Sequence, residues 1–390
     1  AGVLAAVDRG DRPDWRVRPV VGGSPPDQRG VGSTCAYEAR VFGIRSAMPS
    51  REAFRRCPHA VFVPPDMARY EQASRQVFSI FERFSPIIEP ISIDEAFIDV
   101  TGARLLFGDG TTIAKQIRTA IHHEVGLTAS VGIASNKFLA KLGSEKAKPD
   151  GFFAVPEDPD ELLRFLASLN VGALWGVGKV TGDTLGRAGF RTVGDIQKAD
   201  PAYLTRLLGE SLASHLRALA FGHDLREVET VFEDKSLSRE HTFPEDCTNR
   251  ETLRELLKGL ADDVGRRLRT SGRYATVGRL KLRWADFRTI TRQTPFEAAV
   301  CDDFSLRTAA LRLFEAEPLP QPVRLIGFGV SGLCTARNEQ LSLFENAPEI
   351  RSKREKLCHT ADVLREKLGD HALMRVTAAE QLPKRSTGSR

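Results

Sequence analysis

The chain has 390 residues, of which 41% are hydrophobic and 27% are charged, with a formal net charge of +5. These values are typical of a globular protein of about two to four domains, and so small a net charge does not by itself indicate a nucleic-acid partner. The sequence has no long apolar run and no signal-peptide pattern, so we expect neither a membrane protein nor a secreted one. Six scattered cysteines without a CxxC motif predict reduced thiols and a cytoplasmic location.

The first segment, AGVLAAVD, starts with Ala rather than Met and reads as the middle of an element, so we expect residues upstream of Ala1. Next, STCAYEARVFGIRSAMP carries Tyr37 and Arg40 three residues apart, on one face of a helix, with Arg45 further on. A tyrosine hydroxyl beside a guanidinium suits a triphosphate, although each residue alone reads as an ordinary surface residue.

Residues 67–156 alternate helix and strand. Apolar spacing predicts helices over 67–84, 111–126 and 135–148, the last with Ser135 as its N-cap. Strands are expected over 127–134 and 152–156, giving a helix-on-sheet layer in split βαβ order that lacks one central strand.

Within this region IEPISIDEAFIDVT, residues 88–101, predicts a hairpin with the adjacent carboxylates Asp94 and Glu95 in its middle. A solvated turn is the ordinary alternative, but the apolar flanks favour burial, and buried adjacent carboxylates need a cation between them. Successive strand residues face opposite ways, so a bend between the two is required for both to reach one metal. The pair suits Mg²⁺, and a two-metal site takes a third carboxylate from elsewhere. Lys148, in KAKPDG, ends a helix close to this hairpin.

Residues 157–229 predict short helices, interrupted by WGVGKVTGDTLGRAG, and residues 230–234 predict a linker. Gly176 and Gly178 allow backbone N–H groups to approach a phosphate, and Lys179 adds positive charge. This pattern is typical of a helix-hairpin-helix, although a plain turn between helices fits it as well.

A second α+β unit is expected over 235–334, with a capping box from Thr248 to Glu251 at the start of its first helix. Its strands are predicted over 235–243, 276–284, 288–294 and 323–333, and its helices over 248–272 and 303–316. Residues 266–292 hold nine Lys or Arg and one acid. Strand alternation places Arg279, Lys281 and Arg283 on one face, without compensating acids, and Leu280, Leu282 and Trp284 on the other. Such a face grips phosphates without reading bases.

Beyond residue 334 the chain is polar, with a possible helix over 350–368. QLSLF exposes apolar side chains in this polar region, which is typical of a docking peptide. The peptide consists of Gln340, Leu341, Ser342, Leu343 and Phe344.

Four segments together, RGVGSTCAYEARVFGIRSAMP, PISIDEAFIDVTG, SVGIASNKFLAKLGSEKAKPDG and WGVGKVTGDTLGRAGFRTVGD, resemble Y-family translesion DNA polymerases of the bacterial DinB class. The likeness runs from about residue 3 to residue 344. It implies an α+β multidomain fold shaped like a right hand, in a monomer that binds primer-template DNA, dNTPs and two Mg²⁺. The domains would be fingers (1–66, with a remnant of the first palm segment at 1–8), a ferredoxin-like palm (67–156), a helical thumb with the helix-hairpin-helix (157–229), a linker (230–234), an α+β little finger (235–334) and a tail (335–390).

The resemblance also implies roles for single residues. Asp94 corresponds to a metal ligand and Glu95 to a catalytic carboxylate on the same metals. Tyr37, Arg40 and Lys148 match positions that contact the incoming triphosphate. QLSLF looks like the motif that binds the bacterial sliding clamp.

The chain departs from the family at its first segment. The family's first palm strand carries Asp-x-Asp, and aligning AGVLAAVD to it puts Ala1 at the second Asp, so the first would lie upstream. Leu4 falls where the family has an aromatic residue that excludes ribonucleotides. A truncated start and a naturally inactive form both fit. We therefore expect an error-prone, template-directed polymerase, with an inactive DNA- and clamp-binding protein as the alternative. A cyclase on a similar palm is less consistent with the basic strand and QLSLF.

Overall fold

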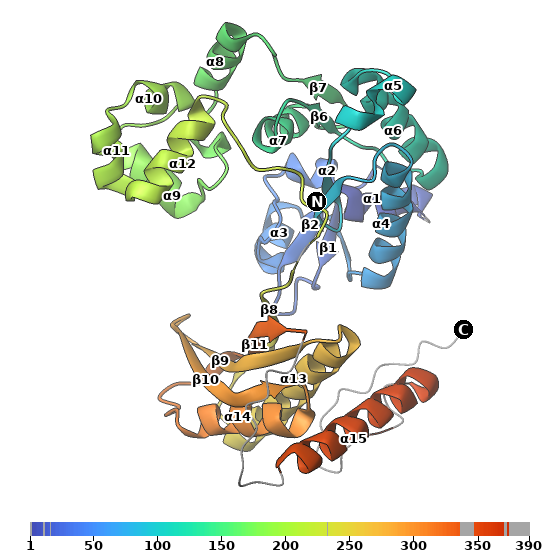
Figure 1. The fold of residues 1–390 in the computed structure, drawn as a ribbon, viewed down its shortest axis with the longest axis vertical. Coiled ribbons are helices and arrows are strands. Elements are labelled where there is room, and N and C mark those ends of the chain that lie inside the picture. The colour runs from blue at the N-terminus through green and yellow to red at the C-terminus, as the bar shows by residue number, and fades with distance from the viewer. Residues whose placement is uncertain are drawn as a thin grey trace. The chain divides into compact units, whose positions relative to one another are not determined.

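The computed structural model describes residues 2–10, 12–15, 17–231, 233–335, 347–369 and 373 (Figure 1). By its internal contacts the chain divides into two compact units, Ala1–Phe232 (unit 1) and Glu233–Arg390 (unit 2). None of the helices formed by the described residues is both long and apolar enough to cross a membrane. All six cysteines are free thiols, as the sequence predicts.

Unit 1 begins with a helix and a small three-stranded sheet of order β2-β1-β3, in which β1 is antiparallel to β2 and parallel to β3. Val21, Cys35 and Ile44 are buried between this sheet and its short helices. The elements are α1 (Gly2–Gly10), the 3-10 turn η1 (Pro13–Trp15), β1 (Val20–Gly23), β2 (Gly32–Cys35), α2 (Tyr37–Arg40), α3 (Ser50–Arg56) and β3 (Val61–Val63).

The next part of unit 1 confirms the predicted alternation of helix and strand. Ile80, Ile113 and Ile117 pack where α4 meets α6, and Gly126 ends α6 with a left-handed backbone (φ 70°) that glycine adopts without strain. The elements are α4 (Met67–Glu82), β4 (Ile88–Ser92), β5 (Glu95–Ile98), η2 (Thr101–Ala103), α5 (Arg104–Phe107), α6 (Gly110–Val125), β6 (Val131–Ile133), α7 (Lys137–Lys146) and β7 (Phe152–Ala154).

Two details of this region differ from the prediction. The N-cap of α7 is Asn136, whose side chain accepts from the Leu139 N–H at 3.0 Å, and not Ser135, because the helix starts one residue later. The strands form two separate pairs, antiparallel β4–β5 and parallel β6–β7, instead of one sheet. No strand of the described residues joins the two pairs.

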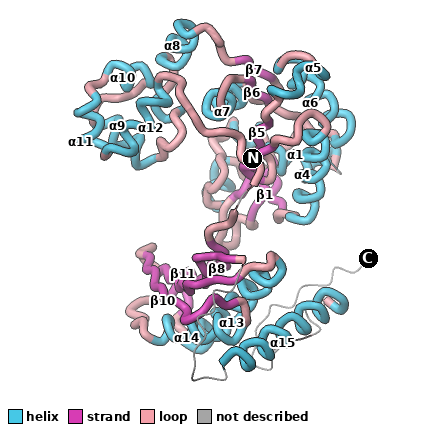
Figure 2. Tube along the Cα trace, in the orientation of Figure 1, coloured by secondary structure: helices cyan, strands magenta, loops and turns pink. Residues whose placement is uncertain are grey.

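A helical cluster completes unit 1 (Figure 2). Leu166, Leu185 and Leu216 are buried at its centre, and a capping box between Thr192 and Asp195 starts α10. The elements are α8 (Pro159–Ala167), η3 (Val171–Ala173), α9 (Lys179–Arg187), α10 (Val193–Lys198), α11 (Pro201–Leu208) and α12 (Glu210–Ala220).

Unit 2 is a four-stranded antiparallel sheet of order β10-β9-β11-β8, with two helices on one face. Leu280, Leu282 and Trp284 of β9 are at most 2% exposed and face α13 and α14, as alternation predicts. The elements are β8 (Ser236–Cys247), α13 (Arg250–Thr270), β9 (Tyr274–Trp284), β10 (Thr289–Val300), α14 (Asp303–Glu315) and β11 (Val323–Cys334).

The predicted capping box at the start of α13 is wrong. Asn249 is the N-cap and accepts from the Thr252 N–H at 3.0 Å. Helix α13 therefore begins at Arg250, one residue later than a cap at Thr248 requires.

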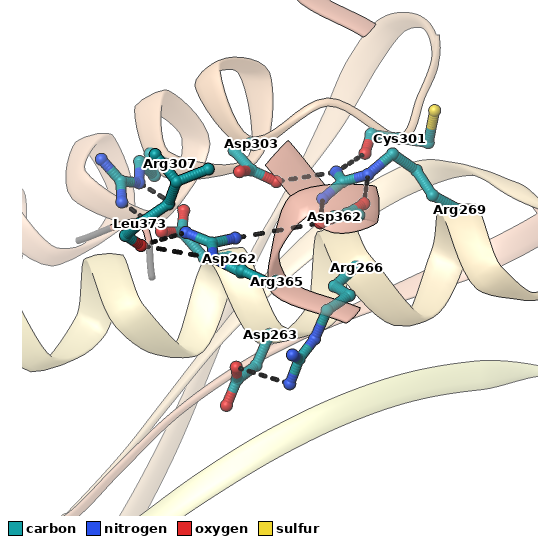
Figure 3. A network of polar contacts seen from close by, with 10 residues as sticks. All are labelled: Asp262, Asp263, Arg266, Arg269, Cys301, Asp303, Arg307, Asp362, Arg365 and Leu373. Carbon is teal, nitrogen blue, oxygen red and sulfur yellow. Dashed lines mark hydrogen bonds and ion pairs between the residues drawn. The ribbon is translucent and has the colours of Figure 1, made fainter. Parts of the chain in front are cut away.

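The helix considered for residues 350–368 is present as α15 (Ala347–Leu368), which packs on α13 and α14 (Figure 3). Arg269 of α13 joins the three helices: its guanidinium donates to Asp362 of α15 at 2.6 Å and to Asp303 of α14 at 2.7 Å. Burial alone would lower the pKa of Arg269, but these carboxylates raise it above its ordinary value. Residues 336–346, which include QLSLF, lie outside the described residues.

Candidate active site and nucleic-acid interface

The carboxylate pair lies at the tip of the β4–β5 hairpin. Ser92 pairs with Glu95 across it, so Asp94 occupies the turn and Glu95 is the first residue of β5. The turn consists of Ile93 and Asp94, and the strand resumes at Glu95. Both are half-buried, and Ser92 Oγ donates to Asp94 Oδ1 at 2.8 Å.

Lysines of α7 and of the turn that follows it lie beside the pair. Lys141 Nζ is 2.8 Å from Glu95 Oε2 and 3.6 Å from Glu145 Oε1, and Lys148 Nζ is 2.6 Å from the same Glu145 oxygen. The charges therefore alternate in a row from Glu95 to Lys148. Lys141 acts as the counter-ion of Glu95, so a metal ion bound by Glu95 would compete with this ion pair.

The surroundings of Asp94 favour its ionised form. Burial alone would raise its pKa, but hydrogen-bond donors and positive charge around it, Ser92 and Lys148 among them, lower the pKa below the ordinary value. An ionised Asp94 beside Glu95 offers the hard oxygen donors that Mg²⁺ takes from a protein, which is one or two carboxylates with substrate phosphates. Among the described residues no group of three or more His, Cys, Asp or Glu side chains could hold a metal. The two residues fit Mg²⁺ as a partial site.

Tyr37 and Arg40 lie together on α2, as their spacing predicts. The Arg40 guanidinium carbon is 4.6 Å from the centre of the Tyr37 ring, and Tyr37 is 41% exposed. Arg45 donates to the Arg40 and Ile44 carbonyls, both at 3.0 Å, so it supports the end of this short helix.

Leu4 lies half-buried on α1. This helix is tied to α4 by a buried hydrogen bond in which the Tyr70 hydroxyl donates to Asp8 Oδ1 at 2.7 Å. Burial raises the pKa of Asp8 above its ordinary value. Leu4 thus sits on a helix with a fixed place against α4.

The glycine-rich turn before α9 has an open groove of about 430 Å³ beside it. Gly176 has a positive φ of 99°, and Gly178 is the N-cap of α9, with nothing within 4 Å of the place where a Cβ would stand. Lys179 is exposed and also lines the groove. A helix N-terminus with open N–H groups and a lysine is suited to a phosphate.

The basic face of β9 forms as predicted, with one correction. Lys281 Nζ is 2.8 and 2.9 Å from the carboxylate oxygens of Glu240 on β8, so the face does have a compensating acid. Gly327 of β11 lies between them, and a Cβ there would be 2.7 Å from Glu240 Cγ, so glycine allows the pair to close. Arg279 is exposed, and Arg283 donates to Thr289 Oγ1 at 2.9 Å.

The sequence reasoning missed a buried pair behind the carboxylate hairpin. Glu89 of β4 and Lys137 of α7 are each 7% exposed and 2.6 Å apart. Lys137 and Lys141, four residues apart on α7, could have been recognised as one basic helical face. A glutamate in a hairpin strand reads as solvent-facing, so nothing in the sequence marks Glu89.

Comparison with known proteins confirms the resemblance to the family. The model of the impB/mucB/samB family matches residues 2–145, and the model of that family's C-terminal domain matches residues 234–343. DNA polymerase IV of Exiguobacterium sibiricum is 41% identical over 329 residues, covering 84% of this chain and 91% of the relative. DNA polymerase IV of Alkalilimnicola ehrlichii is 42% identical over 346 residues, covering 87% and 96%.

Solved structures with a similar fold are also Y-family DNA polymerases. A Y-family DNA polymerase chimera has a TM-score of 0.76 at 24% identity, covering 86% of this chain and 97% of that one. The insertion ternary complex of Dbh DNA polymerase has a TM-score of 0.61 at 25% identity, covering 84% and 96%. The fold is thus the multidomain α+β fold of Y-family polymerases. The chain belongs to that family of DNA-directed DNA polymerases, in the DinB class of DNA polymerase IV.

Proposed function

We propose that this chain is an error-prone translesion polymerase that adds deoxynucleotides to a primer 3′ end by two-metal catalysis. The observation that carries the proposal is the half-buried Asp94–Glu95 turn facing Lys141 and Lys148, in a chain of this family. Relatives of 41–42% identity carry the name DNA polymerase IV. The scattered reduced cysteines fit the cytoplasm.

Asp94 and Glu95 would hold the metal, with two Mg²⁺ expected. When bound, the ions would activate the attacking 3′-oxygen and stabilise the leaving pyrophosphate. Glu95 is already ion-paired with Lys141, which orients its carboxylate at the start of β5. Ser92 orients Asp94 by donating to one of its oxygens.

Tyr37, Arg40 and Lys148 would bind the incoming triphosphate. The stacked Tyr37–Arg40 pair presents a hydroxyl and a guanidinium together, and such charge-assisted hydrogen bonds are the strong ones. Lys148 would exchange its bond to Glu145 for a phosphate oxygen. Leu4 would lie beside the sugar.

Two surfaces would hold the primer-template without reading its sequence. One is the turn with Gly176, Gly178 and Lys179, and the other is the β9 face with Arg279, Lys281 and Arg283. Both offer phosphate contacts only, which suits an enzyme that must accept any template, and binding should weaken steeply with salt.

The domain limits are proposed as the resemblance implies them: fingers 1–66, palm 67–156, thumb 157–229, linker 230–234, little finger 235–334 and tail 335–390. QLSLF would bind the sliding clamp and so raise the effective concentration of a monomeric enzyme at the primer end.

The test is single-turnover incorporation of one dNTP on a primed template with Mg²⁺, by the parent chain and by Asp94→Asn and Glu95→Gln. Each variant should lose more than about 100-fold in rate, because even an outer partner of a metal ligand is worth 10–100-fold. DNA binding at low salt should stay within about threefold, since phosphate contacts dominate affinity. Unchanged rates in both variants would remove the hairpin from the reaction.

A further inference from the structure

A seven-residue segment, 223–229, runs from the end of the helical cluster toward the end of unit 1; we call it the strap. Its beginning is fixed on the N-terminus of α7. Asp224 accepts from the Phe138 N–H at 3.1 Å, and Asn136 Nδ2 donates to the Gly222 carbonyl next to the strap at 2.9 Å. The strap therefore starts from the same helix that supplies Lys141 to the carboxylate hairpin.

The far end of the strap is held by the hairpin itself. Glu89 Oε2 accepts both from Lys137 Nζ at 2.6 Å and from the Glu229 backbone N–H at 2.8 Å. A carboxylate that is 7% exposed must have its charge and lone pairs satisfied, because desolvation is costly. Glu89 thus needs both donors, and it lies on β4, the strand that leads into Asp94.

An aromatic group joins the middle of the strap to the same place. The Phe97 ring of β5 is 5.9 Å from the Trp175 ring and 5.7 Å from Lys137 Nζ. The Arg226 guanidinium carbon of the strap lies 4.5 Å from the centre of the Trp175 ring. Trp175 directly precedes Gly176 of the glycine-rich turn, so the turn, the strap and the hairpin meet at one cluster.

The β4–β5 ladder alone leaves the tip of the hairpin weakly fixed. Its register shifts between Pro90 and Ser92, just before the turn that carries Asp94. A shift of this kind disrupts the regular ladder and re-aims nearby side chains. Contacts from outside the hairpin, such as Lys141 at Glu95, therefore act together with Ser92 in setting where the carboxylates point.

We propose that Glu89 and the Glu229 backbone N–H are positioning groups that fix the Asp94–Glu95 tip to the strap and so relate it to the glycine-rich turn. This inference rests on the proposed function, in which the Asp94–Glu95 tip holds metal and the glycine-rich turn holds DNA. Glu89 touches neither metal nor substrate; it acts through β4.

Glu229→Pro tests the bond directly because it removes the N–H and leaves the other contacts of the strap in place. Two controls match it. Glu229→Ala removes an exposed side chain but keeps the N–H, and Val231→Pro puts a proline at a 75% exposed residue two positions further on. Hydrogen exchange of residues 88–98 reports on the hairpin with no metal present. Mn²⁺ affinity, measured by electron paramagnetic resonance, reports on the carboxylates.

Of the three strap variants, Glu229→Pro alone should speed exchange of residues 88–98. It should also weaken Mn²⁺ binding by about tenfold, as expected when a partner behind a metal ligand is lost. Its thermal unfolding midpoint should match that of Val231→Pro, which a merely structural role would not give. Trp175→Leu should act in the same direction. Identical exchange of the hairpin in all variants would overturn the inference. If the exchange responds but parent and Asp94→Asn bind Mn²⁺ equally, the inference stands and the proposed metal site fails.

Discussion

Lys281 on β9 forms an ion pair with Glu240 on β8. The two side chains meet over Gly327 of the intervening strand β11, where there is no side chain to separate them. The two side chains are each about one-third exposed, so the pair adds little to stability. If the β9 face holds phosphates as proposed, we expect the pair to weaken DNA binding, because Glu240 neutralises one cation of that face.

Glu240→Gln should therefore tighten DNA binding. Freeing Lys281 adds about one phosphate contact, so the plot of log affinity against log salt should steepen by about 0.9. Lys281→Ala should make the slope shallower by a similar amount, and the double variant should behave like Lys281→Ala. Fluorescence anisotropy with a primed template at several salt concentrations measures all three. A slope that Glu240→Gln leaves unchanged would place Lys281 away from DNA.

Leu4 is expected to admit ribonucleotides, since it is smaller and less planar than the aromatic residue that the family has there. Leu4→Phe should raise the preference for dNTP over rNTP, by about tenfold if the ring crowds the 2′-hydroxyl. The ratio of kcat/KM for the two nucleotides measures it. An equal ratio in parent and variant would mean that Leu4 does not lie beside the sugar.

At the scale of elements, helix α7 is central to unit 1, and its N-cap decides how it starts. Asn136 both caps α7 and donates to the Gly222 carbonyl, while the neighbouring Ser135 is exposed. Asn136→Ala should lower the free energy of unfolding of unit 1 by about 1 kcal/mol or more. Ser135→Ala should change it by less than about 0.5 kcal/mol. Urea unfolding followed by circular dichroism separates the two, and equal losses would contradict the assignment of the cap.

Asp224, at the start of the strap, gives unit 1 an acid-sensitive contact. Burial alone would raise its pKa, but Arg226 and the Phe138 N–H hold the pKa below the ordinary value of 3.8. Because folding lowers the pKa of Asp224, its ionised carboxylate contributes fully to the stability of unit 1 at pH values above the ordinary pKa. This contribution is lost as the pH falls through the pKa of the folded state. Asp224→Asn should therefore flatten the loss of stability below about pH 4. Unfolding midpoints from pH 6 to pH 3 check this; parallel curves would contradict it.

The elements show how far sequence reasoning reaches. Apolar periodicity predicted α4, α6, α13 and the β9–β10 hairpin, because each buries one face against a neighbour. Caps were misplaced by one residue at α7 and α13, since Ser, Thr and Asn side by side are equally good caps. The β4–β5 hairpin around Asp94 and Glu95 was predicted from its apolar residues, and the cation expected between the two carboxylates stays a prediction. The ion pairs Lys141–Glu95 and Lys137–Glu89 were not predicted, because spacing within an element says nothing about which side chain of another element comes opposite.

At the scale of the whole molecule, helix α15 adds a further layer to unit 2, beyond residue 343, where the match to the family's C-terminal domain ends. The side chain of Asp362 is 16% exposed and binds the guanidinium of Arg269, which is 7% exposed. In the same region Asp263 and Arg266 form an exposed pair at 3.8 Å (Figure 3). The two aspartates make a matched comparison.

Asp362→Asn should destabilise unit 2 by about 2 kcal/mol, because a largely buried hydrogen bond between two charged groups is weakened. Asp263→Asn should change stability by less than about 1 kcal/mol, as for other surface pairs. Faster hydrogen exchange along residues 352–368 in Asp362→Asn alone would mean that α15 has loosened. Equal stability of both variants would mean that Arg269 does not hold α15 in place.

The central claim is that the Asp94–Glu95 tip performs metal-dependent nucleotide transfer. It is tested most directly by single-turnover dNTP incorporation with Mg²⁺, comparing the parent with Glu95→Gln. The described residues offer two carboxylates at the site, whereas a two-metal scheme normally takes three. The parent chain and Glu95→Gln should therefore also be measured with an added N-terminal strand that bears Asp-x-Asp. The predicted result is dNTP incorporation that is lost in Glu95→Gln, whether the chain is used as it is or with the added strand. Intact DNA binding with no incorporation by either form would contradict the account and leave a DNA-binding protein without catalysis.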